Sequence, residues 1–153
     1  MLNPLHESPF VSLFLLSSLH ALFDIESQDG FKDGNVLVKE MRGSKFVSIR
    51  SCRDCTVQIM CDIQGIDIEA SRNVTVNIAS CSRGMHVTES ISVAIVILRD
   101  SDVCPAVRIV DCLEVALQFP SGSTLPEKTK CVESVRSTNV ITKSNDGSSF
   151  QVY

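Results

Sequence analysis

The strongest constraint on the fold is a repeat of short, alternating apolar segments. One series of segments begins at Phe46, Gly65, Gly84 and Ala106. A second series begins at Cys55, Val74, Val93 and Val115. In both series the steps are 19, 19 and 22 residues. Equal steps in two interleaved series predict coils that each hold two strands and stack on one another, because one repeat alone cannot bury its apolar face.

Within each segment the apolar residues alternate with period two, so successive side chains point into and out of the core. Those predicted to stack inward are Val57, Val76, Ile95, Leu117, Ile59, Ile78, Ile97 and Phe119. Those predicted to face outward are Thr56, Thr75, Ala94, Ala116, Gln58, Asn77, Val96 and Gln118. Aromatic residues make up only 5% of the chain, so the core consists mainly of Val and Ile, which favour strands.

An antiparallel meander would also place strands at short intervals. Two-residue hairpins favour Asn-Gly or Asp-Gly, and neither pair occurs in the connections at residues 51–54, 70–73 and 89–92. The three additional residues in the last step predict an insertion between Leu98 and Ala106. We therefore predict an all-β, right-handed parallel β-helix of about four 19-residue coils over residues 34–153, the handedness following the general rule for parallel crossovers.

The two ends of the chain depart from the repeat. The apolar run from Phe10 to Phe23 spans fourteen residues, too few to cross a bilayer. No Lys or Arg precedes it, which disfavours a signal peptide. We predict a short helix that covers the core, within an N-terminal extension over residues 1–33; a signal or membrane anchor is the alternative.

At the C-terminal end, residues 120–130 are predicted to form a polar loop. The strand at residues 139–143, the turn at residues 145–147 and the strand at residues 150–153 predict a C-terminal hairpin.

Little in the sequence points to catalysis or to a cofactor. Cys52 and Cys55 form a single C-x-x-C pair, whereas a structural zinc site needs four ligands. The odd total of seven Cys favours reduced thiols over a disulfide framework.

Asp67, His86 and Arg108 share one outward position on successive coils, where we expect a charge ladder and part of a binding face. We predict no enzyme activity, metal or cofactor. The net charge of −4 also argues against a nucleic-acid partner.

Two stretches carry a family resemblance. The repeat at residues 45–59 and 65–70 (KFVSIRSCRDCTVQI and GIDIEA) resembles the C-terminal domain of cyclase-associated proteins, which is similar to the tubulin-binding cofactor C domain. Residues 140–144 and 149–152 resemble the lysine–serine strand pair near the end of that domain. The resemblance covers roughly residues 34–153 and implies a parallel β-helix.

The two branches of this superfamily imply different activities. The cofactor C branch stimulates GTP hydrolysis with an arginine in a Gln-x-Arg context, but the matching stretch at residues 62–66 has Ile66 at that position. The resemblance to cyclase-associated proteins implies binding of monomeric actin, preferably the ADP form, with promotion of nucleotide exchange and filament turnover. It also implies a homodimer and a cytoplasmic, cytoskeleton-associated location. An adaptor for tubulin or a small GTPase, without the catalytic arginine, is the alternative.

Candidate actin-binding residues are taken from the outward positions of the predicted strands. A flat sheet with small and amide side chains allows close approach of a protein partner and offers hydrogen bonds to it. The candidates are Thr56, Gln58, Thr75, Asn77, Asp67, His86, Arg108 and Lys143.

Overall fold

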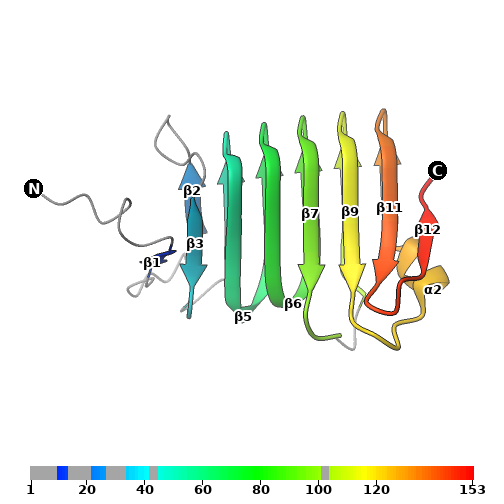
Figure 1. Cartoon of the computed structure of the whole chain (residues 1–153), viewed down its shortest axis with the longest axis horizontal. Helices are drawn as coiled ribbons and strands as arrows, with labels where there is room; N and C mark the ends of the chain where they lie inside the picture. The colour runs from blue at the N-terminus through cyan, green and yellow to red at the C-terminus, as the bar shows by residue number, and fades with distance from the viewer. Residues whose placement is uncertain (1–9, 14–21, 27–33, 42–44, 101–103) are drawn as a thin grey trace, which may run out of the picture.

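The computed structural model describes residues 10–13, 22–26, 34–41, 45–100 and 104–153. In these residues twelve strands join in one sheet that coils on itself, accompanied by one short helix (Figure 1). The first strands are β1 (Phe10–Leu13), β2 (Leu22–Glu26), β3 (Asn35–Val38), β4 (Phe46–Arg50), β5 (Arg53–Glu69) and β6 (Arg72–Thr88). After them come β7 (Ile91–Ile97), β8 (Ala106–Val110), β9 (Leu113–Phe119), α2 (Leu125–Lys130), β10 (Val132–Val135), β11 (Thr138–Ser144) and β12 (Ser149–Gln151).

The strands form two layers with the core between them. The front sheet, which faces the viewer in Figure 1, contains β3, residues 53–59 of β5, residues 72–78 of β6, β7, β9 and β11. The back sheet contains β4, residues 65–69 of β5, residues 84–88 of β6, β8 and β10. All of these strands pair in parallel, so the predicted β-helix is confirmed; its right-handed sense stays a prediction.

The observed register matches the sequence repeat. Val57 pairs with Val76 and Val76 with Ile95, while Gly65 pairs with Gly84 and Gly84 with Ala106. All eight side chains predicted to stack inward are buried, none more than 4% exposed. Val36 and Val38 of β3 extend the same two columns and are fully buried. The 17-residue strands β5 and β6 bend from one sheet into the other, whereas the insertion predicted after Leu98 separates β7 from β8.

A ladder of small polar residues holds the corner between the back and front sheets. Ser71 and Ser90 are buried there. The backbone N–H of Ser71 donates to Ser90 Oγ at 3.1 Å, and Ser90 Oγ donates to the carbonyl of Thr88 at 2.8 Å. Cys112 occupies the next rung, and its N–H donates to Ser137 Oγ at 3.0 Å. This corner contains no glycine, yet residues on both sides of the ladder adopt the left-handed backbone region, among them Asn73 with φ of 53°.

At both ends of the chain the structure differs from the prediction: strands replace a predicted helix at one end, and a helix forms within a predicted loop at the other. The helix predicted from Phe10 to Phe23 is wrong where the chain is described, because residues 10–13 and 22–26 are strands that pair in parallel with β3 and β4; residues 14–21 lie outside the described residues. The predicted boundary at residue 34, between the N-terminal extension and the β-helix domain, stays a prediction. At the other end, residues 125–130 of the predicted polar loop form α2, whose Leu125 packs into the core. The predicted C-terminal hairpin is confirmed by the antiparallel pairing of β11 with β12.

Candidate functional site

Four of the candidate residues form one contiguous patch on the outer side of the front sheet. Thr56 pairs with Thr75, and Gln58 pairs with Asn77. All four side chains are half-buried, and none hydrogen-bonds to another residue in the described part of the chain. Neighbouring strands lie about 4.8 Å apart, so the patch presents two hydroxyls and two amides on a flat surface. We call these four residues the amide patch.

Lys143 lies on the same face as the amide patch but away from it. The rung of Asn77 continues through Val96 and Gln118 to Lys143 of β11. Three strand spacings separate Asn77 from Lys143, which is roughly 14 Å. Lys143 is exposed and has no ion-pair partner in the residues described. The front face therefore combines neutral hydrogen-bonding groups at its centre with a positive charge near its C-terminal end.

The other three candidates lie on the back sheet and form the predicted charge ladder. Asp67, His86 and Arg108 occupy neighbouring rungs of β5, β6 and β8. His86 Nδ1 lies 3.3 Å from Asp67 Oδ1. Arg108 Nε lies 3.3 Å from an oxygen of Glu133, which occupies the next rung. All four side chains are more than half exposed, so the ladder is a solvated surface feature. The eight candidates thus belong to two opposite faces.

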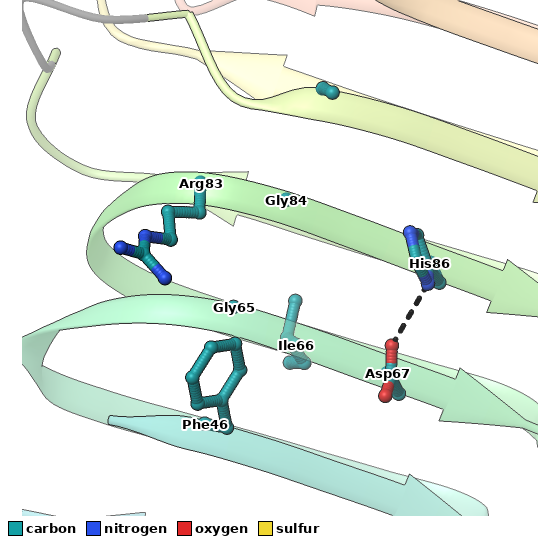
Figure 2. Close-up of a pocket in the computed structure, with 8 residues that line it drawn as sticks. Phe46, Gly65, Ile66, Asp67, Arg83, Gly84 and His86 are labelled. Atoms are coloured by element: carbon teal, nitrogen blue, oxygen red, sulfur yellow. Dashed lines mark ion pairs between the residues drawn. The ribbon is translucent and has the colours of Figure 1, made fainter. Parts of the chain in front are cut away.

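Beside this ladder the back sheet is hollowed. The hollow has a volume of about 450 Å³, and Arg83, Asp67 and His86 line part of it. Figure 2 shows the Phe46 ring over Gly65, with Asp67 and His86 side by side on neighbouring strands. A Cβ atom at Gly65 would come within 2.8 Å of that ring, so the ring occupies the space that the glycine leaves. This hollow was not predicted from the sequence; the paired glycines were the one signal for it.

The C-x-x-C pair belongs to the core. Cys52 and Cys55 are 1% and 4% exposed. The hydrogen-bonded thiol of Cys52 and burial together raise the pKa of Cys55 far above its ordinary value, so this thiol stays protonated. Among the described residues no group of three or more His, Cys, Asp or Glu side chains lies close enough to hold a metal ion. The described part of the chain also contains no helix of the length and hydrophobicity that a bilayer crossing requires.

The cofactor C alternative assigns a catalytic arginine to the position of Ile66. Ile66 is 2% exposed and belongs to the core cluster. A side chain at this position points between the sheets and not toward a partner. An arginine finger acts by reaching the phosphates of a nucleotide bound to another protein, so position 66 cannot supply one in this fold.

The arrangement defines a parallel β-helix with two exposed sheet faces. A family model described as adenylate cyclase associated (CAP) C terminal matches residues 17–151. The chain therefore belongs to the adenylate cyclase associated (CAP) C-terminal family, as the resemblance implied. This family is an actin-binding family and is not known as an enzyme family. No curated protein and no solved structure matches the chain.

Proposed function

We propose that the chain is a regulator of actin monomers that binds them through the front sheet and promotes nucleotide exchange on them. The family membership, which implies actin binding, is the observation that carries this proposal. The proposal includes a preference for ADP-actin, assembly as a homodimer and a cytoplasmic, cytoskeleton-associated location. Nucleotide exchange on ADP-actin accelerates filament turnover, because monomers released from filaments carry ADP and must exchange it.

The amide patch supports the choice of the front sheet. Its hydroxyl and amide groups have no partner within the described residues, so a bound protein can satisfy them without first breaking contacts inside the chain. On the back sheet, by contrast, Asp67 and Arg108 already pair with His86 and Glu133. We propose that the amide patch and Lys143 contact actin, and that Asp67, His86 and Arg108, which lie on the opposite face, contribute from the second subunit of the dimer.

Binding to ADP-actin monomers and release of a fluorescent nucleotide from them test the function. The expected result is saturable binding and faster release in the presence of the chain. Absence of binding at tens of micromolar protein would contradict the proposal. Capture of GTP-loaded small GTPases or of tubulin, with no binding to actin, would favour the adaptor alternative.

Two paired substitutions test the surface. Changing both Gln58 and Asn77 to Lys places two charges in the amide patch, and we expect actin binding to weaken at least tenfold. The control changes Ser82 and Ser121 to Lys, which adds the same charge at exposed positions whose side chains make no hydrogen bond in the described residues. Both proteins should unfold at nearly the wild-type temperature. Equal loss of binding in both would show that net charge, and not the patch, controls the interaction.

A further inference from the structure

Two of the seven cysteines face each other near the C-terminal end of the coil stack. Cys104 lies two residues before β8, and Cys131 is the C-terminal cap of α2. Both are half-buried and line one hollow of about 350 Å³, where the Cys131 thiol is near enough to contribute to a raised pKa of Cys104. Each thiol donates to a nearby backbone carbonyl, that of Pro105 or of Glu127. The backbone N–H of Val107 donates to the carbonyl of Cys131 at 2.9 Å, which fixes Cys131 beside the start of β8.

Contacts that involve no sulfur hold these two segments together. Lys128 Nζ lies 2.7 Å from Asp100 Oδ1 and 5.7 Å from the centre of the Phe119 ring. The Lys128 side chain is only 13% exposed. Ser123 Oγ donates to the other carboxylate oxygen of Asp100 at 3.1 Å. The ion pair therefore anchors α2 to the connection that contains Cys104, and the two sulfurs stay close without a bond between them.

The remaining cysteines differ in access. Cys52 and Cys55 are also neighbouring cysteines, but both belong to the core cluster. Cys81 and Cys112 are buried and donate to backbone carbonyls. Cys61 is half-buried and has no hydrogen-bonded cysteine beside it in the described residues. Cys104 and Cys131 are thus the pair that combines a neighbouring thiol with access from solvent.

We propose that Cys104 and Cys131 form an oxidation site, at which a small-molecule disulfide such as glutathione disulfide closes an intramolecular bond between them. Burial and the Cys131 thiol raise the pKa of Cys104 to about 12, so Cys131 is the first nucleophile. Its thiolate attacks one sulfur of glutathione disulfide, which breaks that bond and expels a glutathione thiolate. Cys104 then loses its proton to solvent and attacks Cys131, breaking the mixed disulfide and expelling the second glutathione. Two protein thiols and one glutathione disulfide become one protein disulfide and two glutathione thiols.

The bond would link the insertion after β7 to the end of α2. A disulfide of this kind closes a loop and lowers the entropy of the unfolded chain. We therefore expect the oxidised chain to unfold at a temperature several degrees higher than the reduced chain. The bond would also fix α2 over the end of the core, where Leu125 packs.

The test incubates the native full chain with glutathione disulfide and then maps peptides without reduction. The expected product is a peptide pair joined through Cys104 and Cys131, with free thiols falling by two from seven and recovering with dithiothreitol. Cys104→Ser should instead accumulate a glutathione adduct on Cys131, while Cys52→Ser should close the bond as the wild type does. Far-UV circular dichroism establishes that each variant is folded, and Cys104→Ala replaces Cys104→Ser if that variant is not.

Three results would overturn the proposal. The first is retention of all seven thiols by the native chain. The second is an intramolecular bond that maps to Cys52 and Cys55. The third is a disulfide that joins two chains while Cys104 stays reduced.

Discussion

Replacing Ser90 with Ala tests how the corner between the two sheets is held. Ser90 is fully buried, and its hydroxyl accepts a hydrogen bond from the Ser71 N–H and donates one to the carbonyl of Thr88. Alanine leaves the Ser71 N–H without its acceptor in an interior that excludes water. A buried donor without a partner costs about 1–3 kcal/mol, and we expect the free energy of unfolding to fall by that amount.

The assay is equilibrium unfolding in urea. Far-UV circular dichroism is the signal of choice, because the chain contains no Trp and one Tyr. A domain of this size has a free energy of unfolding of about 5–15 kcal/mol. The expected loss therefore clearly lowers the urea concentration at the midpoint of unfolding, while the slope of the unfolding free energy against urea concentration stays unchanged. Ser90→Cys should lose less than Ser90→Ala, since Cys112 occupies the equivalent corner and donates to two carbonyls.

The matched control is Ser82→Ala, at an exposed position whose side chain makes no hydrogen bond in the described residues. Surface substitutions of this kind change stability by at most about 0.5 kcal/mol. If Ser90→Ala and Ser82→Ala unfold at the same urea concentration, the serine ladder does not hold the corner, and the reasoning is refuted.

Three further predictions concern a surface ion pair, a close contact and the core. Arg136 donates to Asp111 at 2.6 Å and holds the pKa of that carboxyl below its ordinary value; its stabilising effect is therefore present above the ordinary pKa and lost as pH falls through the folded-state pKa. Asp111→Asn should flatten the acid side of a plot of unfolding temperature against pH, and an unchanged acid side would contradict this. Gly65→Ala should cost about 1–3 kcal/mol of unfolding free energy, and less in a Phe46→Ala background, because the new Cβ meets the Phe46 ring; equal costs in urea unfolding would argue against that contact. Phe119→Ala should cost about 3–5 kcal/mol in the same assay, because Phe119 is 2% exposed, and a cost near zero would show that the C-terminal end of the core is open.

The coils could be predicted because each strand carries its own signal. Alternation with period two is local, so every inward residue from Val57 to Phe119 could be assigned before the strands were paired. The equal steps of the two series then defined the pairing. The charge ladder of Asp67, His86 and Arg108 followed from the same register, since residues one coil apart become neighbours.

The ends of the chain and the hollow could not be predicted in the same way. The largely apolar stretch from Phe10 to Phe23 keeps no strict alternation of period two, so its pattern does not separate a strand from a helix. The helix α2 has six residues and a proline near its start, which resembles a loop in sequence even though proline is favoured in the first helical turn. The hollow depends on where the Phe46 ring lies over Gly65, and that position follows from packing between coils.

The left-handed corner residues have a consequence for how the chain can grow. Each corner is held by hydrogen bonds to the neighbouring coil, as when the N–H of Arg72 donates to the carbonyl of Cys52 and that of Ile91 to the carbonyl of Ser71. Each coil therefore supplies hydrogen-bond acceptors to the corner of the next coil, so one coil is a template for the coil stacked on it. A gene duplication that copies one whole coil would extend the template intact, whereas a gain of one residue within a strand would turn its core side chains outward. Lineages of such chains should thus differ in length by complete coils or by insertions between strands, as between β7 and β8.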